Sequence, residues 1–196
     1  MQEGRSVRSS FIGLDYIVDI THPSGKLSGA AAQVAGRGVI AKANQALAIA
    51  RERGWLTVLV RVGFSPGYPE QPKQSPLFGR VNEINALALG EAGTGFHPDL
   101  WVGLADLVTV KPRVSGFYGT NLDAALRANK IDRLIIAGVS SAWAVQATVR
   151  DAHDRDFQIY IAEDACAAAD EEDHWISMRM LSRIAKIIHV DDMAAL

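Results

Sequence analysis

The sequence predicts an α/β fold in which a six-stranded, mostly parallel, Rossmann-like sheet is sandwiched between helices. Short β-branched segments alternate with helical segments, an order typical of parallel sheets covered on both faces. Residues 55–62 (WLTVLVRV) are almost continuously apolar, as expected of a strand buried on both sides. With 196 residues, 48% of them hydrophobic, the chain can build one sizeable core. We expect a flexible tail at 1–9 and a single domain at 10–196.

The first half of the chain is expected to hold two strands joined by one long helical segment. Residues 10–16 (SFIGLDY) form a short apolar strand, and residues 30–53 carry apolar residues near 3.6-residue spacing. After the strand at 55–62 comes a proline- and glycine-rich region, 63–103, with one short helix expected at 81–89. Connections of this length tend to be functional lids or interface segments. A surface insertion without function is the alternative.

Strands and helices alternate regularly in the second half of the chain. In a parallel sheet the strands end at one edge, and ligands bind beyond that edge. The residues that follow the strands are therefore the candidates for a functional site. The expected strands span 107–110, 134–137, 158–162 and 187–190, and the expected helices span 121–129, 142–153 and 171–184.

Two charged residues stand at strand ends. Asp15 closes the first strand between apolar Leu14 and Tyr16, and a buried carboxylate is costly unless it is paired or performs chemistry. Lys111 follows the third strand. If the two side chains meet in a cleft, the lysine lowers the pKa of the aspartate. The alternatives are a loop-bracing aspartate and a lysine that marks the exit of its strand into solvent, and sequence spacing does not distinguish them.

The fourth strand runs into a Gly-Val-Ser-Ser turn that opens a helix, which is where α/β enzymes place a nucleophile. Backbone N–H groups at such a helix start can bind an anion or a developing oxyanion. The position expected for the nucleophile is Ala144, which carries no reactive group. Ser140 and Ser141 are typical N-cap residues, and the chain has no Gly-x-Ser-x-Gly elbow.

Charge and cysteine content exclude several classes of protein. The net charge of -2 gives no electrostatic reason to expect binding to nucleic acid or to an anionic membrane. No apolar run reaches the roughly 18 residues that span a bilayer, and the first residues lack the apolar core of a signal peptide. The one cysteine, Cys166, excludes an internal disulfide and fits a reducing compartment, so we expect a cytoplasmic location.

These residues, in this order, resemble the isochorismatase-like superfamily, also called the cysteine hydrolases. The resemblance runs from Phe11 to Val190 and is carried by FIGLDY, VKPRVSGFYGTNLDAAL and GVSSAWAVQATVRDAHDRDFQIYIAEDACAA. It implies a six-stranded Rossmann-like α/β/α fold and an active site of Asp, Lys and Cys. By position, Asp15 is implied as the acid/base, Lys111 as its charge partner and residue 144 as the nucleophile. A non-proline cis peptide is implied at Val139–Ser140.

The chain departs from the family pattern at two places. Residue 144 is alanine, so attack by a thiolate is unavailable, and Cys166 lies after the next strand at a position common for a small buried residue. The segment 16–19 (YIVD) replaces the residues that many members carry after the aspartate. The substrate contacts that family members make through this loop therefore cannot be assigned to residues 16–19 of this chain.

Three explanations of Ala144 are open. True isochorismatases also lack the cysteine, protonate a vinyl ether with the aspartate and let water attack, and Asp15 and Lys111 suit such acid catalysis. The second explanation is a cysteine-less branch with another substrate or with a binding role. The third is an engineered Cys→Ala variant.

No metal or cofactor is predicted. Nicotinamidase relatives bind zinc through an aspartate and histidines before the lysine. Here His22 and His97 are the only histidines in that stretch, without an Asp-x-His spacing. Glycine-rich phosphate-binding fingerprints are also absent from the sequence.

The sequence therefore predicts a small-molecule hydrolase of this superfamily that lacks the nucleophilic cysteine and acts on a small vinyl-ether or amide substrate. Asp15 is the expected general acid/base and Lys111 its electrostatic partner. The alternative is a disabled cysteine amidohydrolase that acts as a ligand-binding protein. The residues expected to contact the substrate are Arg61, Phe117, Tyr118, Ser140, Ser141 and Trp143.

The resemblance also implies a homodimer or a homotetramer. We expect exposed hydrophobic residues of the 63–103 region to form the interface. These are Phe64, Tyr68, Leu77 and Phe78.

Overall fold

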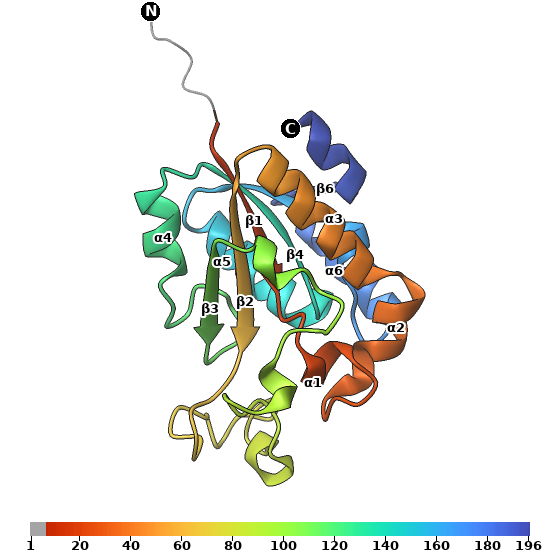
Figure 1. Cartoon of the computed structure of the whole chain (residues 1–196), viewed down its shortest axis with the longest axis vertical. Helices are drawn as coiled ribbons and strands as arrows, with labels where there is room; N and C mark the ends of the chain where they lie inside the picture. The colour runs from red at the N-terminus through yellow and green to blue at the C-terminus, as the bar shows by residue number, and fades with distance from the viewer. Residues whose placement is uncertain (1–6) are drawn as a thin grey trace, which may run out of the picture.

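The computed structural model describes residues 7–196 and confirms the six-stranded α/β sheet (Figure 1). The strand order is β3-β2-β1-β4-β5-β6, and every neighbouring pair is parallel. The carboxyl ends of all six strands therefore lie at one edge. The strands are β1 (Ser9–Leu14), β2 (Leu56–Val62), β3 (Leu107–Lys111), β4 (Arg133–Gly138), β5 (Gln158–Ala162) and β6 (Lys186–Ile188).

Helices cover both faces of the sheet. Right-handed crossovers place α3 and α5 on opposite faces, because the chain crosses the sheet in one direction from β1 to β2 and in the other from β4 to β5. In Figure 1, α3 lies in front of the strands and α5 behind them. The α-helices are α1 (Val18–Thr21), α2 (Ala31–Gly36), α3 (Val39–Glu52), α4 (Leu122–Ala128), α5 (Gln146–His153) and α6 (Glu171–Leu181).

Several short helical turns complete the chain. One of them, η5 (Ser141–Val145), is a π-helical turn that leads directly into α5. The 3₁₀ turns are η1 (Ser28–Ala30), η2 (Val81–Ile84), η3 (Ala92–Thr94), η4 (Val102–Leu104), η6 (Glu163–Ala165) and η7 (Val190–Ala195).

The predicted helices differ from the observed ones in two places. The segment 30–53 is not one helix, because Gly38 adopts left-handed backbone with φ 64° and separates α2 from α3. The helix expected at 81–89 is wrong beyond its first turn, since η2 ends at Ile84 and is followed by Asn85 with φ 53°. The chain then passes beside Phe64, which forms an isolated parallel bridge with Ala88 and whose N–H donates to the carbonyl of Leu87 at 2.8 Å.

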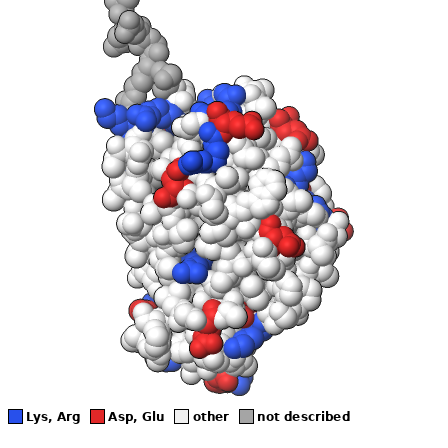
Figure 2. Space-filling model, in the orientation of Figure 1, with Lys and Arg blue, Asp and Glu red and all other residues white. Residues whose placement is uncertain are grey.

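The expected tail at 1–9 extends too far, because β1 begins at Ser9. Ser9 already pairs with Arg133 of β4, so at least this residue belongs to the sheet. Residues 1–6 of the expected tail lie outside the described residues. None of the helices within residues 7–196 is long and apolar enough to cross a bilayer. On the face drawn in Figure 2, positive and negative side chains are scattered among uncharged ones.

The 63–103 region has a hydrophobic core of its own, here called the insertion cluster. It joins side chains of the insertion to Ile17 and to Val62 at the end of β2. Phe64, Tyr68 and Phe78 are buried in it, so these three residues are not exposed as an interface would require, and only Leu77 of the expected four is exposed. The members are Ile17, Val62, Phe64, Tyr68, Phe78, Val81, Ala86, Leu87 and Ala88.

Candidate active site

A buried ion pair joins the ends of two strands. Asp15 directly follows β1 and Lys111 is the last residue of β3, and the lysine Nζ lies 2.7 Å from Asp15 Oδ2. Both side chains are almost completely buried. The second aspartate oxygen accepts a hydrogen bond from the N–H of Val62 at 2.7 Å, and Lys111 Nζ also donates to the carbonyl of Val114 at 2.7 Å. The two residues that the sequence singled out therefore meet.

The pKa of Asp15 is raised above its ordinary value of 3.8. Burial is the largest cause, and the charge and hydrogen bond of Lys111 and the N–H of Val62 oppose it without cancelling it. The pKa of Asp15 is therefore shifted upward, whereas Lys111 alone would lower it. A carboxyl group with a raised pKa can hold and release a proton, which is what general acid/base catalysis requires.

The turn after β4 approaches the ion pair from the other side. Gly138 ends the strand with φ 153°, and a Cβ at this position would overlap the backbone of Leu14. The peptide bond between Val139 and Ser140 is cis, as the family resemblance implied. The N–H of Val139 donates to the carbonyl of Leu14 at 3.0 Å, so the turn is held directly against β1.

Most amides of the turn already have acceptors. The N–H of Ser141 donates to the carbonyl of Ala167 at 2.8 Å, and the N–H of Ala142 donates to Ser140 Oγ at 3.2 Å. The N–H groups of Trp143 and Val145 donate to the carbonyl of Ser140. Within residues 7–196, the N–H of Ser140 donates to no acceptor, and the N–H of Ala144 donates to none outside η5. The anion site expected at this turn is therefore reduced to these two amides.

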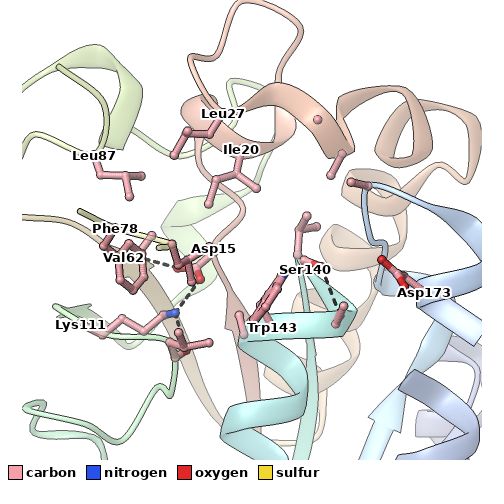
Figure 3. Close-up of a pocket in the computed structure, with 18 residues that line it drawn as sticks. Asp15, Ile20, Leu27, Val62, Phe78, Leu87, Lys111, Ser140, Trp143 and Asp173 are labelled. Atoms are coloured by element: carbon pink, nitrogen blue, oxygen red, sulfur yellow. Dashed lines mark hydrogen bonds and ion pairs between the residues drawn. The ribbon is translucent and has the colours of Figure 1, made fainter. Parts of the chain in front are cut away.

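A cavity of about 240 Å³ lies between the ion pair and the turn (Figure 3). Asp15 and Lys111 line one side, Trp143 and Ala144 line the turn side, and Asp173 of α6 lies across from the ion pair. Nearly all of the remaining wall is apolar. The other lining residues are Ile20, Leu27, Gly29, Ala30, Val62, Leu77, Phe78, Leu87, Val114, Val139, Ser140, Ala142 and Ala169.

Four residues expected to contact a substrate lie outside this lining. Side chains alternate along a strand, and since Val62 faces the cavity, Arg61 points away and donates to the carbonyl of Thr94 at 3.0 Å. Phe117 is buried against Phe157. The other two are Tyr118, which is exposed beside Arg113, and Ser141, which is buried with its Oγ 2.7 Å from His174 Nδ1.

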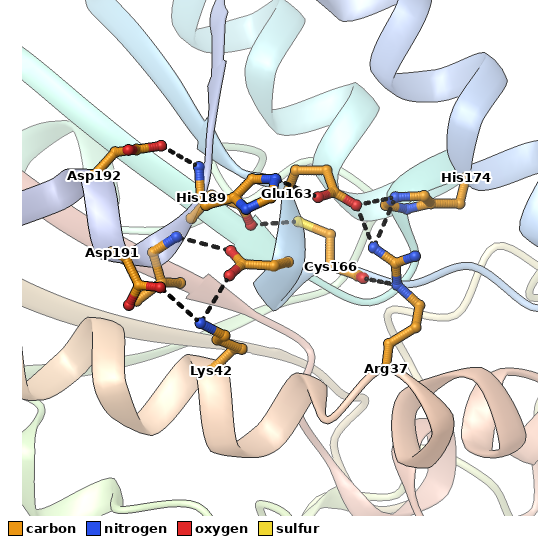
Figure 4. Close-up of polar contacts among 11 residues, drawn as sticks. Arg37, Lys42, Glu163, Cys166, His174, His189, Asp191 and Asp192 are labelled. Carbon is orange, nitrogen blue, oxygen red and sulfur yellow. Dashed lines mark hydrogen bonds and ion pairs between the residues drawn. The ribbon is translucent and has the colours of Figure 1, made fainter.

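A second polar cluster, here called the Glu163 network, consists of Glu163, Arg37 and His174 (Figure 4). His174 Nε2 lies 2.8 Å from Glu163 Oε1, and Arg37 forms an ion pair with the same oxygen. Ser141 connects the network to the turn through His174. Burial alone raises the pKa of Glu163, but His174 and Arg37 outweigh it and hold the pKa below 4.5. None of Arg37, Glu163 and His174 is among the site residues that the sequence predicted.

Cys166 has the environment of a structural thiol. It is fully buried and donates to the carbonyl of Ala162 at 3.3 Å, and burial raises its pKa to about 12. A thiol with such a pKa is protonated and unreactive near neutral pH. Within residues 7–196, no three side chains of His, Cys, Asp and Glu are grouped so that they could hold a metal ion.

Comparisons of sequence with known proteins agree with one another. The profile of the isochorismatase domain matches residues 11–192. The "Uncharacterized isochorismatase family protein YecD" of Escherichia coli O157:H7 is 33% identical over 163 residues, which cover 79% of this chain and 81% of YecD. The ureidoacrylate amidohydrolase RutB of Methylobacterium radiotolerans is 33% identical over 174 residues, which cover 80% of this chain and 67% of RutB.

Solved structures show the same architecture. An isochorismatase family protein from Desulfovibrio vulgaris has a TM-score of 0.85 at 20% identity, with 96% of this chain and 97% of that one covered. The N-carbamoylsarcosine amidase of Thermoplasma acidophilum has a TM-score of 0.75 at 26% identity, with 94% of this chain and 98% of that one covered. The first likeness concerns the fold alone, and the second extends to the sequence of a known amidase.

Proposed function

The chain belongs to the isochorismatase family of hydrolases, and from this premise we propose that it hydrolyses a small amide or vinyl-ether substrate by acid/base chemistry at Asp15. The observation that carries the proposal is the buried contact of 2.7 Å between Asp15 and Lys111 in the wall of the cavity. The sequence similarity to RutB and to N-carbamoylsarcosine amidase supports hydrolysis of a carbon–nitrogen bond. We propose further that Ala144 stands where other family members carry their cysteine.

For an amide, the proposed reaction uses water directly, because the methyl group of Ala144 cannot attack. Asp15 takes a proton from water, and the water oxygen attacks the carbonyl carbon. The oxyanion that forms is stabilised by the charge of Lys111 and by the N–H of Ala144. Asp15 then returns the proton to the nitrogen as the carbon–nitrogen bond breaks, which yields an acid and an amine.

For a vinyl ether, Asp15 acts in the opposite sense and starts as the acid. Its proton goes to the terminal vinyl carbon, and water adds to the cation that results. The adduct loses a proton and collapses to a ketone and an alcohol. The raised pKa of Asp15 supports this role, because a protonated carboxyl is the reacting form.

The test is the Asp15→Asn variant. Asparagine tolerates the left-handed backbone of Asp15, which has φ 55°. We expect turnover of amides and vinyl ethers, followed by ammonia release or ketone formation, to fall by about 10²–10⁴-fold, the typical contribution of a general acid/base. Asp156→Asn is the matched control, since Asp156 is also left-handed with φ 64° and lies outside the cavity lining. Full activity of Asp15→Asn would overturn the assignment.

A second candidate, a ligand-binding protein derived from a cysteine amidohydrolase, is favoured by Ala144 itself. The position faces the cavity beside the ion pair but offers no nucleophile. In this case the unaltered protein binds amides without turning them over, and Ala144→Cys gains amidase activity. Turnover by the unaltered protein that Asp15→Asn abolishes would exclude this candidate.

We also propose that the protein is a homodimer or homotetramer, as the family resemblance implies. Of the interface residues suggested by the sequence, Leu77 is the one that is exposed, at 43%. Light scattering at micromolar concentration measures the assembly directly. A monomer under these conditions would contradict the proposal.

A further inference from the structure

We infer that the cavity selects substrates with a small apolar body that is uncharged or carries a cationic group, and that it rejects substrates with a free carboxylate or phosphate. This inference rests on the proposed function, because it names the substrate class of the same site. Three features of the cavity support it: the charges of its lining, its apolar walls and the two side chains at its far end.

The cavity offers no free cation to an anionic ligand. Lys111 is the one positively charged residue of the lining, which contains neither arginine nor histidine. Its ammonium group is already engaged by Asp15 Oδ2 and by the carbonyl of Val114, each at 2.7 Å. Asp15 and Asp173 add two carboxylates. An anion that enters would lose its hydration without gaining a counter-ion, which is strongly unfavourable.

The walls between these charges are apolar and close together. Phe78 and Leu87 of the insertion cluster face the cavity, together with Ile20 and Leu27 of the segment after β1. The volume of about 240 Å³ is below the roughly 300–1,000 Å³ of sites for drug-sized ligands. A compact hydrocarbon group therefore fits, and its burial is the main attraction that the walls provide.

Two side chains at the far end of the cavity favour a positive charge. Asp173 lies across the cavity from the ion pair and forms no ion pair with any residue in 7–196. Trp143 lines the cavity between them and leaves 57% of its surface exposed. A ligand cation between Asp173 and the indole ring would gain both a carboxylate partner and a cation–π contact.

The test compares three amides that share one skeleton and differ in charge: benzamide, 4-(aminomethyl)benzamide and 4-carbamoylbenzoate. Affinities are measured by calorimetry, which does not depend on turnover. We expect the cationic amide to bind at least ten times more tightly than the carboxylate, with benzamide between them. Equal or tighter binding of 4-carbamoylbenzoate would overturn the inference.

Asp173→Asn tests the source of the preference. We expect it to weaken binding of the cationic amide several-fold and to reduce the discrimination against the carboxylate. Glu172→Gln is the matched control, because Glu172 is exposed in the same helical turn and does not line the cavity. An unchanged charge preference in Asp173→Asn would overturn the role of Asp173.

Binding and turnover separate this inference from the proposed function. If the three amides bind in the expected order but are not hydrolysed, the charge preference of the cavity is supported and the proposed hydrolase activity is contradicted. If 4-carbamoylbenzoate is hydrolysed in preference to the other two amides, the hydrolase activity is supported and the charge preference is contradicted.

Discussion

Asp15 and Glu163 are two buried carboxylates on opposite sides of the same turn, and their pKa values are shifted in opposite directions. Burial raises the pKa in both cases. Asp15 has one cationic partner, Lys111, and its pKa stays raised. Glu163 has His174 and Arg37, and its pKa is lowered. The direction of each shift follows from the balance between burial and the partners of the carboxylate: Lys111 and the N–H of Val62 do not offset burial at Asp15, whereas His174 and Arg37 outweigh it at Glu163.

The two sites also differ in access. Asp15 lines a cavity, so a substrate can reach its carboxyl group. Glu163 is buried, does not line that cavity and is hydrogen-bonded to Arg37 and His174. Asp15 therefore suits the proposed chemistry, and the Glu163 network suits support of the turn.

The largest effect is expected from Lys111→Met. The change removes the one cation beside Asp15, and breaking a buried ion pair leaves an uncompensated carboxylate. We expect the free energy of unfolding in urea to fall by about 3 kcal/mol. Lys186→Met, at an exposed lysine, should cost much less. Adding Asp15→Asn to Lys111→Met should restore part of the loss, and an additive double variant would show that the pair is not coupled.

Glu163→Gln should have a smaller effect on stability. Arg37 loses its carboxylate, but its side chain is 20% exposed, so water compensates part of the loss. We expect a decrease of about 2 kcal/mol in the free energy of unfolding. Since the network supports the turn and touches no substrate, KM should change more than kcat. A loss of kcat as large as that of Asp15→Asn would show that Glu163 takes part in the reaction, and it would contradict the supporting role assigned to the Glu163 network.

The opposite pKa shifts predict opposite pH dependences of stability. Glu163 has a lowered pKa, so the stability that it contributes is present above about pH 4.5 and is lost as the pH falls further. Asp15 has a raised pKa, so between its unfolded value of 3.8 and the raised value the native state binds the proton more tightly, and stability falls as the pH rises. Urea titrations of the native protein, Asp15→Asn and Glu163→Gln between pH 3 and 7 measure both differences. If both variants change the pH dependence of the free energy of unfolding in the same way, the opposite pKa shifts of Asp15 and Glu163 are contradicted.

The smallest effect is expected from Cys166→Ala. The thiol is buried and donates one weak hydrogen bond, so we expect a loss of about 1 kcal/mol or less and unchanged activity. In the native protein a thiol reagent should react only as fast as the protein unfolds, because the thiol is fully buried and burial also keeps it protonated, with a pKa of about 12. Rapid labelling of the native protein at pH 7 would contradict this environment.

The sequence predicts which residues lie at the carboxyl edge of the sheet better than it predicts which of them are in contact. Asp15 and Lys111 could be named because each follows a strand, and parallel strands end at one edge. Their contact could not, because it depends on the strand order that places β2 between β1 and β3. The direction of the Arg61 side chain could not be predicted for a related reason: β2 is apolar on both faces, so its sequence does not reveal which residues face the cavity.

The Glu163 network and the insertion cluster could not be predicted from local patterns. Arg37, Glu163 and His174 come from the end of α2, from η6 and from α6, and no spacing connects them. The aromatic residues of the 63–103 region stand among prolines and glycines, which suggested an exposed loop. They are buried because the region folds back on itself around Phe64, a long-range arrangement that residue composition does not encode.

Two separate parts of the chain contribute to the cavity: the 63–103 region with its insertion cluster, and the edge of the sheet. The region supplies Leu77, Phe78 and Leu87 to the cavity wall, whereas the ion pair and the turn come from the edge of the sheet. It has its own core and is tied to α1, where Asp19 Oδ2 accepts the N–H of Leu87 at 2.7 Å. Under the proposed function, we therefore expect substitutions within this segment to reshape the cavity while Asp15 and Lys111 stay in place. Substrate preference can then diverge between related chains while the reaction at the edge of the sheet stays the same.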